Sequence, residues 1–157
     1  MGEFIDDIKD EHKTIRLYLF KLQSLESSGD WRQRELEYAK LKDVLFPHLH
    51  AEETVLFPLM ANREELREKI LYYIHQHSII KKFNDELSDR SKRAYNWLAG
   101  IKTFHELIEM HIKREEPEYC RMIGFVDPER LESVHKRFLQ EEIRWRKQMQ
   151  DLKTKPY

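Results

Sequence analysis

The sequence predicts an all-α protein, an antiparallel up-and-down four-helix bundle with an extra C-terminal helix. Three observations predict it. Strong helix formers (Glu, Lys, Arg and Leu) dominate a chain of 157 residues that contains only 4 Gly and 5 Pro. Apolar side chains recur at steps of three and four residues in five segments. The connections between the segments are short, and short connections place neighbouring helices antiparallel.

The first segment, residues 3–25, has the buried stripe of a bundle helix. A histidine, His12, stands in this stripe where an apolar residue is expected. Ser, Gly and Asp over residues 27–30 predict the turn that ends the helix. The other residues of the stripe are Ile5, Ile8, Ile15, Leu19 and Leu22.

The second segment, residues 32–60, places a histidine and a carboxylate on its buried stripe. His48 and Glu52 are four residues apart, so both side chains lie on one face of a helix, about one turn apart. Pro47 removes a backbone donor in the middle of the segment. We therefore expect a kink or a widened turn just before His48.

The third and fourth segments continue this pattern. The third, residues 63–87, has His77 in its stripe. The fourth ends near Met122, and in it His111 is followed four residues later by Glu115. The spacing of the second segment is therefore repeated in the fourth, which a chance match explains poorly.

A fifth helix is predicted over residues 129–152. Asp127 as an N-cap and Pro128 at the first helical position predict its start. We interpret the chain as one domain, in which residues 1–123 form the bundle and residues 124–157 add a helix that packs on it. This helix could also mediate a homodimer through its apolar residues, which include Phe138, Trp145 and Met149.

The histidines in the stripes are predicted to lie at one depth in the bundle. His12 and His48 are nearly equidistant from the turn at residues 27–30, and His48 and His77 are nearly equidistant from residue 62. Offsets of one or two residues correspond to roughly 2–3 Å along a helix. The match between His77 and His111 is looser, and a long connection between their helices would repair it.

A layer of histidines and carboxylates in a core indicates a metal site. An unpaired polar group in a core costs roughly 1–3 kcal/mol, and a buried charge costs more, so six such groups need a common partner. Four imidazoles and two carboxylates suit two iron-like ions that each take two histidines and share both carboxylates. The predicted ligands are His12, His48, Glu52, His77, His111 and Glu115.

Other metal sites fit the sequence less well. Structural zinc prefers four ligands and usually some thiolate, and the chain has one cysteine, Cys120. Ferritin-like di-iron proteins need the Glu-x-x-His motif twice, and it occurs here once, at Glu132 and His135. Glu53 and Glu116 adjoin the predicted ligands, so they are expected to face solvent or to lie behind those ligands.

Charge and hydropathy exclude several classes of partner. A formal net charge of −1 argues against nucleic acid or an anionic membrane as the main partner. No apolar run approaches the ~18 residues that a membrane span needs, and the first residues are too acidic for a signal peptide. A single cysteine leaves no intrachain disulfide. The expected location is the cytoplasm.

Four stretches of the chain resemble the hemerythrin family, specifically the bacterial and archaeal hemerythrin-like HHE cation-binding domains. The resemblance covers about residues 3–123. It implies a non-haem di-iron centre, with or without an oxo or hydroxo bridge, in which Glu52 and Glu115 bridge two iron ions. The stretches are DEHKTIR from Asp10, HLHAEETVLFP from His48, HSII from His77 and HIKREE from His111.

One position departs from the family pattern. Oxygen-carrying hemerythrins have a further histidine one turn before the position that matches His77, and Tyr73 stands there. Tyr73 either binds ferric iron as a phenolate, or lines the ligand pocket, or serves only in packing and hydrogen bonding. In the last two cases a coordination position stays open or is filled by water.

Three kinds of function stay open from the sequence. The first is a protein that binds or senses O2 or a related small oxidant. The second is a di-iron redox enzyme, which is peroxidase-like or catalase-like or reduces O2 or NO. The third is a protein that stores or senses iron. The expected small ligand is thus O2, peroxide or NO, and no nucleotide-binding loop, nucleophile elbow or catalytic triad favours a kinase or a hydrolase.

Overall fold

The computed structural model describes residues 2–25, 30–88 and 96–154, and the predicted turn residues 27–29 lie outside this part of the chain. The described residues form helices and turns, without a strand, so the predicted fold class is confirmed. The long helices are α1 (Gly2–Ser24), α2 (Trp31–Ala51), α4 (Arg67–Ser88), α5 (Asn96–Ile123) and α6 (Pro128–Thr154), and the short elements are the π-helix η1 (Glu52–Leu56), α3 (Phe57–Ala61) and the 3-10 helix η2 (Glu64–Leu66).

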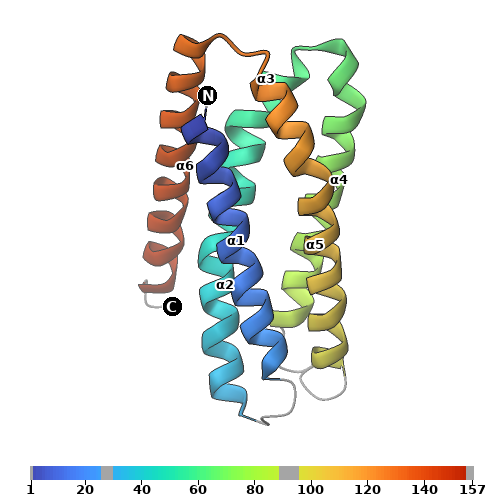
Figure 1. Cartoon of the computed structure of the whole chain (residues 1–157). Coiled ribbons are helices and arrows are strands. Elements are labelled where there is room, and N and C mark those ends of the chain that lie inside the picture. Colours follow the sequence, from blue (N-terminus) through green and yellow to red (C-terminus); the bar gives the residue numbers. More distant parts are fainter. Residues whose placement is uncertain (1, 26–29, 89–95, 155–157) are drawn as a thin grey trace.

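Successive long helices run in opposite directions along the bundle (Figure 1). α1, α2, α4 and α5 form the four rods, and α3 continues the rod of α2. α6 packs on the outside against α2 and η1. It begins at Pro128, as the sequence predicts, and the backbone N–H of Leu131 donates to the carbonyl oxygen of Asp127 at 2.8 Å. The fifth helix therefore covers one side of the bundle.

The rod of α2 contains one widened turn. In η1 the backbone N–H of Phe57 donates to the carbonyl oxygen of Glu52, five residues back. Pro58 follows, and it has no N–H with which to continue the regular helical pattern. A widened turn just before His48 is contradicted, because α2 stays helical through Pro47 and the wide turn begins at Glu52. A kink at Pro47, the other form of this expectation, stays a prediction.

Two apolar clusters fill the interior, one on each side of a polar layer. Ile8 belongs to one cluster and Ile15 to the other, and the buried His12 lies between them on α1. The same order holds on α4, where His77 lies between Tyr73 and Ile80. The polar layer is therefore enclosed above and below by packed side chains.

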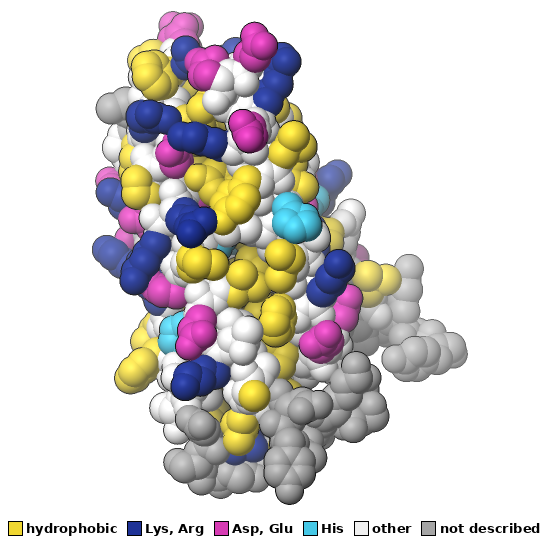
Figure 2. Space-filling model, turned by 90° about the vertical axis from the view of Figure 1, so that its right-hand side faces the viewer, with side chains coloured by type: hydrophobic (Ala, Val, Ile, Leu, Met, Phe, Trp, Pro, Cys, Tyr) yellow, Lys and Arg dark blue, Asp and Glu magenta, His cyan; other side chains and the backbone are white. Residues whose placement is uncertain are grey.

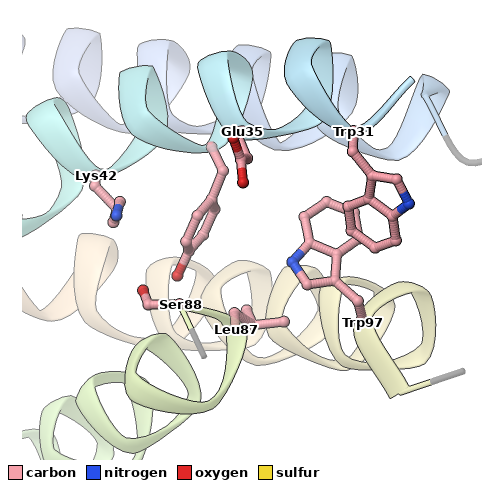
Figure 3. A pocket seen from close by; sticks show the side chains of 7 residues that line it. Trp31, Glu35, Lys42, Leu87, Ser88 and Trp97 are labelled. Carbon is pink, nitrogen blue, oxygen red and sulfur yellow. The ribbon is translucent and has the colours of Figure 1, made fainter. Parts of the chain in front are cut away.

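A small cavity of about 200 Å³ lies at the end of the bundle where α2 and α5 begin. Figure 3 shows the rings of Trp31 and Trp97 side by side at one end of it, with Leu87 and Ser88 on the wall that α4 contributes. The two indole rings meet edge to face, with their centroids 5.3 Å apart. No histidine is among the described residues that line this cavity, so it is separate from the polar layer.

The surface of the described residues carries apolar side chains on more than one helix. Figure 2, which shows the side of the molecule that lies to the right in Figure 1, has hydrophobic side chains gathered along its middle. Leu71, Tyr72 and Ile74 of α4 are exposed, as are Ile143 and Leu152 of α6. Apolar exposure therefore does not single out α6 as an interface. Among the described helices, none has both the length and the apolar character that a membrane span requires.

Candidate metal centre

The six predicted ligand residues lie together in the polar layer. α1, α2, α4 and α5 each contribute one histidine, and η1 and α5 each contribute one glutamate. The side chains are buried because each is at a stripe position that faces the bundle axis. Their exposed fractions are 0–1% for His12, His48, Glu52, His77, His111 and Glu115.

Glu52 lies between the two halves of the layer. Its Oε1 atom is 2.6 Å from Nε2 of His48, and its Oε2 atom is 3.2 Å from Nε2 of His77. The two oxygens of one carboxylate therefore face histidines on two different helices. A bridging carboxylate between two cations has the same arrangement.

Glu115 repeats this arrangement on the other side of the layer. Its Oε1 atom is 3.2 Å from Nε2 of His12, and its Oε2 atom is 2.6 Å from Nε2 of His111. Each histidine pair thus meets one oxygen of each carboxylate. The resulting groups, each with its ligand atoms within 4.8 Å of one another, are His12, His48, Glu52 and Glu115, and His77, His111, Glu52 and Glu115.

Bound cations would give carboxylate oxygens of this layer the partners that the described residues do not supply. Both oxygens of Glu52 and Oε1 of Glu115 are buried and accept no hydrogen bond within the described residues. A buried carboxylate without a partner costs several kcal/mol. Atoms in adjacent positions of an octahedral ion lie about 3 Å apart if the bonds are about 2.1 Å, and the nitrogen–oxygen distances here are 2.6–3.2 Å.

Each of the four histidines also makes a hydrogen bond through Nδ1, on the other edge of its ring. Carboxylates and amide oxygens only accept, so each Nδ1 carries a proton and each Nε2 faces the layer. A hydrogen bond of this kind behind a histidine ring orients its Nε2 atom toward a bound cation. The acceptors are Glu116 for His12 (2.7 Å), Glu11 for His48 (2.6 Å), Glu53 for His77 (2.9 Å) and Gln76 for His111 (2.6 Å).

Two of these four acceptors were named from the sequence, with a position behind the histidines as one of two alternatives, and the other two were missed. Glu53 and Glu116 lie behind the histidines, which is one of the two places allowed for them. Glu11 and Gln76 were not singled out. Each directly precedes a stripe histidine, His12 or His77, so each points to a neighbouring helix. That adjacency is the signal that could have found them.

Two phenol rings lie beside the layer. The predicted residue Tyr73 is buried next to the ring of His111, with the centroids 5.9 Å apart, and its hydroxyl donates a long hydrogen bond of 3.5 Å to the carbonyl oxygen of Arg114. Tyr119, which the sequence did not single out, donates its O–H to Oε2 of Glu115 at 3.0 Å. Tyr119 therefore contacts a carboxylate of the layer directly.

In the metal-free protein, nearby carboxylates raise the pKa of two histidines of the layer, His48 and His77. Burial lowers the pKa of His77, but the close contact with Glu52, the hydrogen bond to Glu53 and the charge of Glu52 outweigh this effect and raise the pKa to about 9. The pKa of His48 is also raised, because Glu52 and Glu11 outweigh burial there. Without a cation, protons therefore take its place in the layer.

We expect the metal-free protein to lose stability as the pH rises. A histidine whose folded pKa is raised stabilises the fold fully below its unfolded pKa of about 6.5. That contribution is lost as the pH rises through the folded pKa, which is about 9 for His77. The melting temperature of chelator-treated protein should therefore fall between pH 6.5 and pH 9. A melting temperature that rises over this range would contradict the assignment.

Glu11, the acceptor behind His48, also approaches a carboxyl group of α6. Glu142 is 2% exposed, and burial together with the hydrogen bond to Glu11 and the charge of Glu11 raises its pKa to about 9. Burial acts on Glu11 in the same direction, but the hydrogen bond and the charge of His48 outweigh it and lower the pKa of Glu11 to about 2. Glu11 is therefore the ionised member of this pair.

Comparison with known proteins gives one match. The family model described as the hemerythrin HHE cation binding domain matches residues 3–123, from the first turn of α1 to the last residue of α5. α6 lies outside the matched region. No curated protein and no solved structure matches the chain significantly. Because the match covers all four rods and the whole polar layer, the chain belongs to the hemerythrin family, as a protein with an HHE cation-binding domain.

Proposed function

We propose that the chain holds two iron ions at a carboxylate-bridged centre and uses them to bind or sense O2 or a related small oxidant. The observation that carries this proposal is the pairing of the layer, in which each carboxylate turns one oxygen to each histidine pair. The proposed ligands are the six buried residues of the layer, His12, His48, Glu52, His77, His111 and Glu115.

The donor set favours iron over zinc. Each proposed ion receives two imidazole nitrogens and two carboxylate oxygens, with no thiolate. Histidine and carboxylate donors with open positions are typical of non-haem iron, whereas structural zinc is closed by four ligands. An octahedral ion would keep two positions for other ligands. Bound iron would supply the reversible one-electron chemistry with oxygen species that protein side chains lack.

The enclosure of the layer favours a small ligand. All six residues are at most 1% exposed, and apolar clusters lie on both sides of them along the bundle. An extended organic substrate would have to separate these packed clusters, which costs several kcal/mol. Molecules with two heavy atoms, such as O2, peroxide or NO, need no such rearrangement.

A di-iron redox enzyme is the second candidate. The observation that favours it is the contact of Tyr119 with Glu115, because a buried phenol beside the layer could supply a proton or an electron to a bound oxidant. The proposed products would be those of peroxide, O2 or NO reduction. This candidate differs from the first in requiring turnover.

Absorption spectroscopy separates the two candidates. The iron-loaded protein is reduced without oxygen, exposed to O2, and then in a second sample exposed to H2O2. A stable spectrum that reverts when O2 is removed supports binding or sensing. Rapid and repeated consumption of peroxide supports the enzyme, and a protein that responds to neither oxidant contradicts both.

Replacement of Tyr73 tests its predicted place at the centre. Tyr73 is not a member of either ligand group, and its hydroxyl donates to Arg114. We therefore expect Tyr73→Phe to change the rate of reaction with O2 or peroxide more than it changes the iron content. If Tyr73 ligates ferric iron, this variant also loses a visible charge-transfer band. Tyr18→Phe on α1 is the matched control.

If Tyr73→Phe and the parent have the same absorption spectrum and the same peroxide kinetics, Tyr73 serves only in packing. The functional argument drawn from the missing family histidine then fails, while the metal proposal stands.

A further inference from the structure

α6 reaches the metal layer although it lies outside the matched family domain. The ring of Phe138 meets the ring of His48 edge to face, with the centroids 6.0 Å apart. One turn further along α6, Glu142 is buried. Its carboxyl group, that of Glu11 and His48 each offer one atom within 4.8 Å of the other two. The fifth helix thus places a polar group next to a proposed ligand.

Glu11 links this group to the ligand. Nδ1 of His48 donates to Oε2 of Glu11 at 2.6 Å. A buried carboxyl group is costly unless it makes a hydrogen bond, and Glu11 is the polar neighbour that Glu142 meets. The second oxygen of Glu142, Oε2, is buried without a hydrogen-bond partner among the described residues. The other charged neighbours of Glu142 are His48 and Arg146, which is one turn further along α6.

Glu53, the acceptor behind His77, is also held by a second side chain. Glu53 accepts the hydrogen bond of His77, and Lys81 donates to both oxygens of Glu53 at 2.8 and 2.9 Å. On that side a surface ammonium holds the acceptor in place. On the side of His48, a buried side chain from α6, Glu142, lies within 4.8 Å of the acceptor Glu11.

We propose that Glu142 is a positioning residue for the metal centre. Its carboxyl O–H donates to the carboxylate of Glu11, which holds the Nδ1–H of His48 and so directs Nε2 at the ion. The inference rests on the proposed di-iron centre and extends it, because it makes α6 a working part of that centre. Outer hydrogen bonds of this kind change metal affinity by about 10–100-fold.

The test compares substitutions that keep or remove the donor. Glu142→Gln retains an N–H that can donate to Glu11, and Glu142→Leu has a similar volume without a donor. Glu132→Leu, at an exposed position of the same helix, is the matched control. The measurement is the rate at which each iron-loaded protein releases iron to a chelator.

We expect one of the two ions to leave about 10–100-fold faster in Glu142→Leu than in the parent. Glu142→Gln and Glu132→Leu should release iron at the parental rate. In a Glu11→Ala background, Glu142→Leu should add no further effect, because the carboxylate that links Glu142 to His48 is already absent. Equal acceleration in Glu142→Gln and Glu142→Leu would overturn the proposal, as would parental release by Glu142→Leu. A third metal ion per chain that Glu142→Gln abolishes would also overturn it.

A measurement on the metal-free protein keeps this test separate from that of the proposed function. In histidine-labelled protein, nitrogen-15 NMR should show a slowly exchanging Nδ1–H of His48 in the parent and in Glu142→Gln. The signal should exchange faster in Glu142→Leu. Failure of the parent to hold iron contradicts the proposed function alone, whereas an unchanged signal in Glu142→Leu contradicts the positioning role alone.

Discussion

Glu52→Ala should lose both ions, whereas His48→Ala should lose one. The two oxygens of Glu52 face different histidine pairs, so its removal takes one ligand from each proposed ion. Of the two groups of the polar layer, His48 belongs to one only. The measurement is iron per chain by elemental analysis, with circular dichroism to establish that each variant is folded.

Two exposed residues of α4 supply the controls for these variants. His75→Ala changes a histidine two residues before His77, and Glu86→Ala changes a glutamate near the end of the same helix. Both should keep the parental iron content, because neither is in the polar layer. Full iron content in both Glu52→Ala and His48→Ala would show that the layer is not the metal site.

Removal of the metal should lower the melting temperature by about 8–16 °C. A ligand that binds only the folded state stabilises it by about 4 kcal/mol at a thousand times its dissociation constant, and 1 kcal/mol shifts the melting temperature of a chain of this size by about 2–4 °C. Three buried carboxylate oxygens also lose their proposed partner. Thermal unfolding with and without a strong chelator measures the difference.

The Glu52→Ala variant is the control for this effect. It should bind little metal, so a chelator should leave its melting temperature unchanged, and this separates metal loss from any direct action of the chelator. Identical unfolding curves for the parent with and without chelator, at complete iron removal, would contradict a metal centre that supports the fold.

The sequence predicted the fold and the composition of the layer because both depend on helical period. A stripe with steps of three and four places His12 and His77 in the interior whatever the details of packing. The sequence placed the widened turn near Pro47, but the structure has it at Glu52, before Pro58. Both prolines are in the segment, and the spacing of apolar residues does not indicate which of them the wide turn accompanies.

The hydrogen bonds behind the proposed ligands could not be predicted in the same way. Glu11 and Gln76 lie one position off the stripe, so their partners depend on which helix is the neighbour and on how far each helix is rotated. Glu142 depends in addition on where α6 packs, and it meets a residue 131 positions earlier in the chain. The helical period of a single segment contains no information about such contacts.

The most direct test of the central claim is the Mössbauer spectrum of the oxidised protein, recorded with its iron and zinc content after expression in iron-rich medium. The proposal that Glu52 and Glu115 bridge two ions predicts two irons per chain, with high-spin ferric ions magnetically coupled to each other. Stoichiometric zinc without iron, or a single magnetically isolated ferric ion, would contradict it.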